Sequence, residues 1–219
     1  MRQSLIALLV IIVLCSGCAS KDQPPRAQAD SNWNSAQEPP LTGETYFASG
    51  IFAESQGNIA RAVAQYEQCL AVEPKHEQAL YRLAVLRTQA KQYPQAIEAW
   101  KQYLAATNRS AAAYSNLALA YELAGKRADA EAAYRAGIDA DPDYVACRVN
   151  YGLMLARTGR TDEALAQFES VLTPAEACYN IASIFEQQGK TDEARTWYRA
   201  ALEKNPTFTD ARTRLAALN

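Results

Sequence analysis

The sequence predicts an all-α protein, built as a solenoid of repeated helix–turn–helix units. Five turn residues recur along the 219-residue chain, the first four spaced 34 residues apart and the last after 30: Gly57, Lys91, Gly125, Gly159 and Gly189. Self-similarity at a fixed step of about 34 residues is typical of stacked helical hairpins. Small and aromatic residues recur at the same step. We therefore expect units at 43–76, 77–110, 111–144, 145–174 and 175–208, and a capping helix in 209–219.

Small residues are expected wherever two helices lie close together. On the first helix of each unit they are Gly50, Ala84, Ala118, Gly152 and Ala182. On the second helix they are Ala62, Ala96, Ala130, Ala164 and Ala194. Aromatic side chains are expected to fill the space between neighbouring units: Tyr66, Trp100, Tyr134, Phe168 and Tyr198. Because no unit buries its apolar face alone, stability is a sum of unit and neighbour-interface contributions.

The first two units differ in how closely they follow this pattern. The first unit has its terminal proline at Pro74, and we expect His76, just behind it, to be a solvated loop residue with no ligand role. The second unit has Lys91 where the others have a turn glycine, so its turn is expected to follow a slightly different path. In this unit Arg87 also stands where an apolar residue is expected, and Asn108 stands where the terminal proline is expected.

The third unit follows the pattern most fully and ends with Pro142, whereas the fourth is four residues shorter. Four residues are about one turn of an α-helix. The residue before a proline disfavours the α region. The second helix of the fourth unit is therefore expected to end near Leu172, just before Thr173 and Pro174.

The fifth unit regains the pattern and ends with Pro206, and the cap repeats only the start of a unit. Within the cap, Leu215 and Leu218 are expected to face inward, with Arg212 and Arg214 on the exposed side.

Residues 43–219 resemble the tetratricopeptide repeat family, and the resemblance implies a right-handed superhelix of five hairpins with a capping helix. It also implies a concave groove, lined by the first helices, that holds a protein partner. The groove positions expected from this resemblance are Phe47, Ile51, Tyr81, Arg82, Val85, Asn116, Leu119, Asn150, Leu153, Tyr179 and Asn180. They are mostly apolar, which favours an apolar partner segment, either extended or an amphipathic helix.

Three asparagines stand one unit apart in this groove: Asn116, Asn150 and Asn180. An asparagine amide can donate to a peptide carbonyl and accept from a peptide N–H, so the three could hold an extended main chain; they could equally well be solvated. Arg82 is the one cation at the fifth, sixth or ninth position of any unit. Capture of a terminal carboxylate by a cluster of cations is therefore disfavoured.

Residues 1–17 are predicted to be a signal peptide outside the fold. Arg2 precedes an apolar run from Leu5 to Leu14, which is shorter than the ~20 residues of a membrane span but typical of a signal-peptide core. The run leads into Leu14-Cys15-Ser16-Gly17-Cys18, which resembles the bacterial lipoprotein box and implies lipidation of Cys18. Cys15 departs from the aliphatic residue usual at its place. An ordinary cleaved signal peptide and an uncleaved anchor are the alternatives.

Residues 18–42 are predicted to be a lipidated, disordered tether, because they are rich in Gln, Ser, Asn and Pro and poor in the apolar surface that folding requires. Ala19 and Ser20 follow Cys18, and by resemblance to Gram-negative lipoproteins they favour the periplasmic face of the outer membrane. A lipid anchor, a tether and five repeats resemble TadD-like lipoproteins of tight-adherence pilus machines and type IV pilus pilotins. A general envelope scaffold, serving cell-wall enzymes or outer-membrane protein assembly, is the alternative.

No other chemistry is expected of the chain. The formal net charge is −2, without the basic stripe that nucleic-acid binding needs. We expect no catalytic residues, metal, cofactor or small-molecule substrate. Cys69, Cys147 and Cys178 sit at helical positions beside small residues, where cysteine packs as a small hydrophobe. Whether Cys147 and Cys178 form a disulfide is left open.

Overall fold

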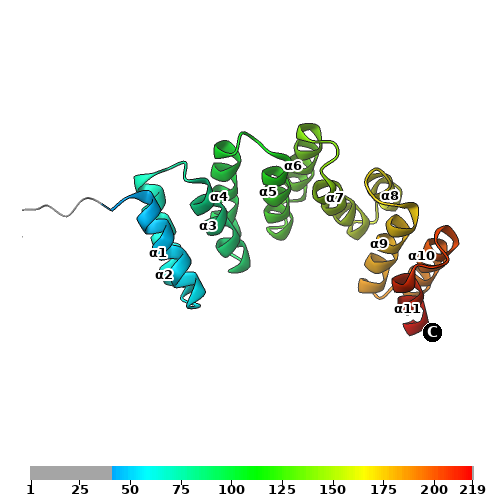
Figure 1. The fold of residues 1–219 in the computed structure, drawn as a ribbon. Coiled ribbons are helices and arrows are strands. Elements are labelled where there is room, and N and C mark those ends of the chain that lie inside the picture. Colours follow the sequence, from blue (N-terminus) through cyan, green and yellow to red (C-terminus); the bar gives the residue numbers. More distant parts are fainter. Residues whose placement is uncertain (1–40, 219) are drawn as a thin grey trace, which may run out of the picture. The chain divides into compact units, whose positions relative to one another are not determined.

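The computed structural model describes residues 41–218, which form eleven helices and no strand (Figure 1). The first six helices are α1 (Gly43–Ser55), α2 (Ile59–Val72), α3 (Glu77–Gln89), α4 (Tyr93–Ala106), α5 (Ala111–Leu123) and α6 (Arg127–Ala140). The remaining five are α7 (Val145–Arg157), α8 (Thr161–Glu169), α9 (Pro174–Gln187), α10 (Thr191–Lys204) and α11 (Thr209–Ala217). The prediction of an all-α solenoid is confirmed. The signal peptide expected over 1–17, the lipidated Cys18 and the tether up to residue 40 lie outside the described residues.

Consecutive helices pair into hairpins, which follow one another along the Leu41–Asn219 unit (Figure 1). In this unit the extensive contacts all join helices of the same hairpin or of neighbouring hairpins. First helices also contact one another directly, α5 with α7 and α7 with α9, whereas second helices make no contact of comparable extent among the described residues. The first helices therefore lie on the inner side of the stack.

The small and aromatic positions pack as the repeat predicts. Ala62, Ala130 and the other three small residues of the second helices are fully buried. Gly50 lies so close to Tyr66 that a Cβ atom there would be 2.4 Å from Cε1 of the ring. Gly152 lies similarly close to Phe168, with 2.6 Å for the same pair of atoms. Close approach of the two helices of a hairpin thus depends on these small residues.

Four of the five aromatic residues that fill the space between units have a polar partner twelve residues earlier in the chain. Three tyrosine hydroxyls donate to a glutamate of the preceding helix: Tyr66 to Glu54 at 2.8 Å, Tyr134 to Glu122 at 3.4 Å and Tyr198 to Glu186 at 2.6 Å. Trp100 donates through Nε1 to Thr88 at 3.1 Å. Phe168 has no donor, and the residue twelve positions before it is Ala156. Burial is the main cause of the raised pKa of each of these tyrosines, and the neighbouring glutamate raises it further.

The turn at Lys91 follows the same path as the glycine turns, so the expected difference is wrong. Lys91 adopts a φ of 58°, in the left-handed region also occupied by Gly125 with 74°. The hydrogen bonds are equivalent as well: Lys91 N donates to Thr88 O at 3.0 Å, and Gly125 N donates to Glu122 O at 2.9 Å. Packing of the flanking helices therefore holds Lys91 in the left-handed backbone conformation that glycine adopts in the other turns.

The fourth unit is short because its second helix is short. Helix α8 has 9 residues, whereas α2, α4, α6 and α10 each have 14. It ends at Glu169, three residues before the predicted Leu172, whose N–H still donates to Phe168 O at 2.8 Å. The earlier end leaves room for Thr173, which caps α9 through a reciprocal capping box with Glu176.

His76 is a buried structural residue, so its expected place in a solvated loop is wrong. Its side chain is 5 % exposed and stacks near Phe47, with ring centroids 4.8 Å apart. Its Nδ1 accepts from Ala79 N at 3.2 Å, which caps α3, while Nε2 lies 3.3 Å from Glu44 Oε2. The histidine thus joins the first helices of the first two units.

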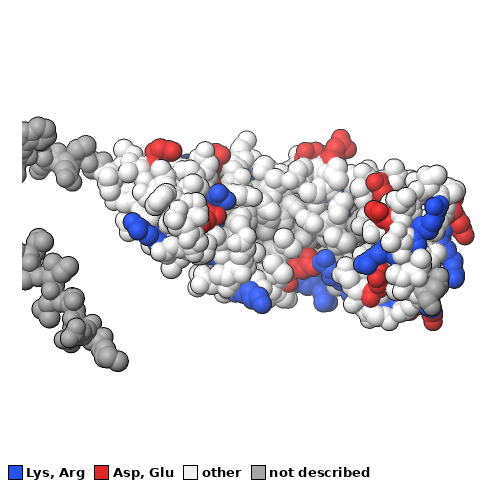
Figure 2. All heavy atoms as spheres, turned by 60° about the horizontal axis from the view of Figure 1, so that its bottom comes forward, with Lys and Arg blue, Asp and Glu red and all other residues white. Residues whose placement is uncertain are grey.

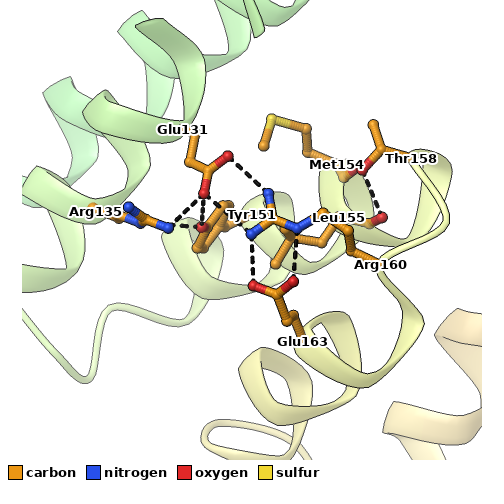
Figure 3. A network of polar contacts seen from close by, with 8 residues as sticks. All are labelled: Glu131, Arg135, Tyr151, Met154, Leu155, Thr158, Arg160 and Glu163. Carbon is orange, nitrogen blue, oxygen red and sulfur yellow. Dashed lines mark hydrogen bonds and ion pairs between the residues drawn. The ribbon is translucent and has the colours of Figure 1, made fainter. Parts of the chain in front are cut away.

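A network of charged residues joins the third and fourth units (Figure 3). Arg160, at the turn before α8, bonds Glu131 of α6 at 2.8 Å and Glu163 of α8 at 2.6 Å. Glu131 also accepts from the hydroxyl of Tyr151 at 3.0 Å and pairs with Arg135. Hydrogen bonding from Arg160 is the main cause of the lowered pKa of both Glu131 and Glu163.

The cap and the cysteines complete the fold. Leu215 of α11 and Leu218, directly after it, pack on the last core cluster, while Arg212 and Arg214 stay exposed, as predicted. Cys147 and Cys178 are both free and buried, as is Cys69, so the open question of a disulfide is answered by free thiols in this structure. Burial raises the pKa of the Cys69 and Cys147 thiols to about 11.

Candidate functional site

The eleven predicted groove residues are all at least partly accessible in the structure. Two of them are well exposed, Tyr81 at 41 % and Leu119 at 37 %, although both are large and apolar in character. The other nine are half-buried. Apolar side chains of the first helices that point toward the neighbouring hairpins, such as Leu83 and Leu117, are buried instead. The first helices therefore present a second apolar surface that the fold itself does not cover.

The most defined part of this surface is a hollow of about 430 Å³ between the first two units, hereafter the groove pocket. Its walls come from α1, α3 and α4: Phe47, Ile51, Glu77, Gln78, Tyr81, Arg82 and Tyr103. Four of these seven residues were predicted from the sequence, whereas Glu77, Gln78 and Tyr103 were not. Tyr103 could have been found, since the equivalent positions in the other units hold smaller residues: Cys69, Gly137, Val171 and Ala201.

Aromatic packing fixes the shape of the groove pocket. Tyr81 packs edge-on against Trp100, with ring centroids 5.6 Å apart and an angle of 80° between the planes. Tyr103 packs on both Tyr81 and Trp100, at 5.6 Å and 5.7 Å. Edge-to-face pairs of this kind are favourable beyond the area they bury. Because the rings hold one another, the pocket walls are formed before any partner arrives.

Three glutamates near the inner surface each pair with an arginine of the following unit or cap. Glu54 lies 3.4 Å from Arg82 of the next unit, Glu122 lies 2.5 Å from Arg157, and Glu186 lies 3.5 Å from Arg214. Each of these glutamates also accepts from a tyrosine hydroxyl, as described above. The guanidinium of Arg82 is thus engaged by Glu54, which disfavours its use as a clamp for a terminal carboxylate.

The three groove asparagines differ in their contacts. Asn150 donates to Ser115 Oγ of the preceding unit at 3.3 Å, and Asn180 donates to Glu176 O on its own helix at 3.1 Å. Among the residues described, Asn116 has no hydrogen-bond partner for its side chain. The three asparagines thus differ in their hydrogen bonding. Their side-chain carbonyl oxygens accept no hydrogen bond from another group within residues 41–218.

Charged side chains are unevenly spread over the surface seen in Figure 2, where they are dense over the C-terminal end and scattered elsewhere. Within residues 41–218, no cluster of three or more histidine, cysteine, aspartate or glutamate side chains could hold a metal ion. None of the helices of the described part is both long enough and apolar enough to cross a membrane.

Comparison with protein families finds three matches along the chain. All three family models are described as tetratricopeptide repeat, and they match residues 53–121, 116–178 and 175–208. Together they run from residue 53, near the end of α1, to residue 208, behind α10. No curated protein sequence is similar enough to count as a match.

Comparison with solved structures finds proteins of similar fold and low sequence identity. MamA is 23 % identical with a TM-score of 0.62, and the match covers 77 % of this chain and 94 % of MamA. A tetratricopeptide repeat protein of Thermus thermophilus is 25 % identical with a TM-score of 0.55, covering 81 % and 98 %. YrrB, described as having an unusual peptide-binding site, is 19 % identical with a TM-score of 0.58, covering 84 % and 97 %.

Proposed function

Because the chain is a tetratricopeptide repeat protein, we propose that it is a non-catalytic scaffold that binds a segment of a partner protein along its first helices. The observation that carries this proposal is the groove pocket, whose aromatic walls are accessible although each unit has already buried its own core. Accessible apolar surface of this kind marks interaction sites. A peptide-binding site on the same fold in YrrB is consistent with it.

The bound segment is apolar, and one large side chain of it enters the groove pocket. Phe47, Tyr81 and Tyr103 would contact that side chain, and truncation of such buried aromatic anchors typically dominates binding energetics. The carbonyl oxygens of Asn116 and Asn150 could accept from the segment's main chain. Both an extended segment and an amphipathic helix satisfy these requirements.

We further propose that the scaffold is lipidated at Cys18 after removal of residues 1–17 and works at the periplasmic face of the outer membrane. The box Leu14-Cys15-Ser16-Gly17-Cys18 supports this proposal, together with Ala19 and Ser20 behind it. A diacylglycerol and an amide-linked acyl chain on one cysteine would give stable membrane attachment, at about 0.8 kcal/mol per buried methylene. By resemblance, the machine it helps to assemble is a pilus or secretion apparatus.

Partner binding can be tested with a photo-crosslinking amino acid at Tyr81 in the intact cell envelope. We expect a covalent adduct with one protein, whose crosslinked peptide is apolar and is identified by mass spectrometry. The same amino acid at Val72, which is exposed at the end of α2, is the matched control and should give no such adduct. Equal crosslinking from both positions would contradict binding at the groove pocket. If the crosslinked protein is a cell-wall enzyme, the chain acts as a general envelope scaffold and not in a pilus or secretion apparatus.

Lipidation can be tested separately by metabolic labelling with a palmitate analogue. The native chain should incorporate the label and fractionate with the outer membrane. The Cys18→Ser variant should do neither, whereas Cys15→Ser should keep both. An unlabelled native chain would overturn the anchor but leave the groove proposal standing.

A further inference from the structure

Within residues 41–218, nothing covers the outer side of the first hairpin, which forms a surface distinct from the groove pocket. It surrounds a hollow of about 580 Å³, and we call it the end face; its residues are Thr42, Glu44, Thr45, Ala48, Ser49, Phe52 and Arg61. Phe52 is 65 % exposed, the largest exposure of any large hydrophobic side chain in the part of the chain described.

The repeat register shows that Phe52 occupies a position that is otherwise always covered. The equivalent residues of the next four units are Leu86, Ala120, Met154 and Ile184, all 4 % exposed or less. Each lies on a first helix that packs against the preceding second helix: α2 on α3, α4 on α5, α6 on α7 and α8 on α9. Within residues 41–218 no hairpin precedes α1. Among the described residues, the end face therefore has the position of an inter-unit interface that no hairpin covers.

The opposite end of the stack is closed differently. Leu215 of α11 and the following Leu218 pack inward, while Arg212 and Arg214 stay exposed. After Val145, no large hydrophobic side chain up to residue 218 is well exposed. The C-terminal end thus offers little apolar surface to cover Phe52, which disfavours a head-to-tail arrangement of copies.

The end face is complementary to itself. Glu44 lies in the first turn of α1, and Arg61 lies in the first turn of α2, directly after the turn that follows α1. Because the two helices form a hairpin, these charges stand at opposite ends of the face. Ala48 and Ser49 lie between them and are small enough for close approach. A two-fold axis near Ala48 therefore brings Glu44 of each copy toward Arg61 of the other.

We propose that the end face binds the end face of a second copy of this chain, in a two-fold arrangement of the isologous kind common in homodimers. Phe52 of each copy fills the hollow of the other, and the Glu44–Arg61 pairs set the antiparallel orientation. Phe47 and Ile51 of the groove pocket lie on another side of α1, so the dimer carries two accessible grooves. The inference is independent of the proposed partner and of the proposed anchor.

The test is sedimentation of the full chain in detergent solution, across a wide range of concentration. We expect a reversible monomer–dimer equilibrium for the native chain. Phe52→Glu should raise the dimer dissociation constant by about tenfold or more. The side chain at this position is exposed, so the fold should survive. Val145→Glu, on an exposed residue of α7, is the matched control and should leave the equilibrium unchanged. Circular dichroism of each variant checks the fold.

Two further experiments test the orientation. Arg61→Glu should weaken the dimer, and Glu44→Lys in the same chain should restore it. A cysteine at Ala48 should give a disulfide-linked dimer on oxidation, beyond the background of the native cysteines, whereas one at the exposed Ala216 of α11 should not.

A native chain that is monomeric throughout would overturn the proposal, as would a dimer that Phe52→Glu leaves intact. A dimer lost with Phe52→Glu but crosslinked from Ala216 rather than Ala48 would replace the two-fold arrangement by head-to-tail association. None of these results bears on partner capture at Tyr81.

Discussion

The hydroxyl of Tyr198 donates a 2.6 Å hydrogen bond to the carboxylate of Glu186, twelve residues earlier and on the other helix of the same hairpin. The same step joins Tyr66 to Glu54 and Tyr134 to Glu122. Where the aromatic residue is Phe168, the acceptor is replaced by Ala156. In each unit, the residue twelve positions before the interior aromatic residue thus matches that aromatic residue in polarity.

This match predicts that a polar pair can be transplanted into the fourth unit. Phe168→Tyr alone would bury a hydroxyl beside Ala156 and should lower the free energy of unfolding by about 1–3 kcal/mol. Ala156→Glu alone should also destabilise, because the carboxylate enters a buried position without a donor. The double variant should recover much of the loss. Urea unfolding of the four chains gives the coupling energy, and a coupling near zero would contradict the proposed pairing.

The native pair at the last hairpin provides the reverse test. Tyr198→Phe removes the donor to Glu186 and should cost about 1–2 kcal/mol of unfolding free energy. Tyr46→Phe on α1, a half-buried tyrosine whose hydroxyl makes no hydrogen bond within the described residues, is the control and should be nearly neutral. A loss of equal size in both variants would show that the hydroxyl contact does not matter.

The left-handed conformation of Lys91 predicts that this turn can be stabilised. The left-handed conformation costs a residue with a Cβ atom about 1–2 kcal/mol. Replacement by glycine removes this cost, but it also increases the conformational entropy of the unfolded chain, which offsets part of the stabilisation. Lys91→Gly should therefore stabilise by roughly 0.5–1 kcal/mol. Gly125→Ala is the converse and should destabilise by about 1 kcal/mol, since nothing lies within 4 Å of the added Cβ and the cost is conformational. Thermal unfolding of both variants checks the opposite signs.

The close contact at Gly50 predicts an effect opposite to helix propensity. Gly50→Ala gains about 1 kcal/mol of propensity, but its Cβ would lie 2.4 Å from Tyr66 Cε1. Overpacking of this kind costs about 1–3 kcal/mol, so the net effect should be a loss of up to about 2 kcal/mol. Gly50→Ala combined with Tyr66→Leu should remove the clash, and a stabilised single variant would contradict this account.

The network around Arg160 predicts a pH dependence. Hydrogen bonds from Arg160 lower the pKa of Glu131 and Glu163 below the usual 4.5. Carboxyl groups with lowered folded-state pKa values stabilise the fold above their unfolded values and lose that contribution as the pH falls. Stability should therefore decline below about pH 4.5. Arg160→Gln should lower the melting temperature at pH 7 and flatten the acid decline, whereas Arg199→Gln, a change of an exposed arginine outside this network, should do neither.

The helical hairpins could be predicted because their small and aromatic residues are properties of single positions repeated along the chain. The tyrosine–glutamate pairs could also have been predicted, because the twelve-residue step between their members is present in the sequence. His76 could not be placed, because its burial depends on the distant Phe47 and Glu44. The conformation of Lys91 could not be predicted for a related reason. It is decided by the packing of α3 and α4 and not by the backbone preference of lysine.

The same distinction applies to the candidate site. Phe47, Ile51, Tyr81 and Arg82 were predicted because the first-helix positions of a repeat are known once the register is known. Glu77 and Gln78 reach the groove pocket from the start of α3. Their contribution depends on how the second unit sits against the first, which a register alone does not specify.

Contacts limited to neighbouring hairpins give the stack a mechanical property. No extensive helix–helix contact in residues 41–218 spans more than one step along the repeat. Small rotations at successive joints therefore add up to large changes in curvature while each interface stays intact. The unit is thus suited to act as an elastic arm, which could stretch or tighten under load without unfolding.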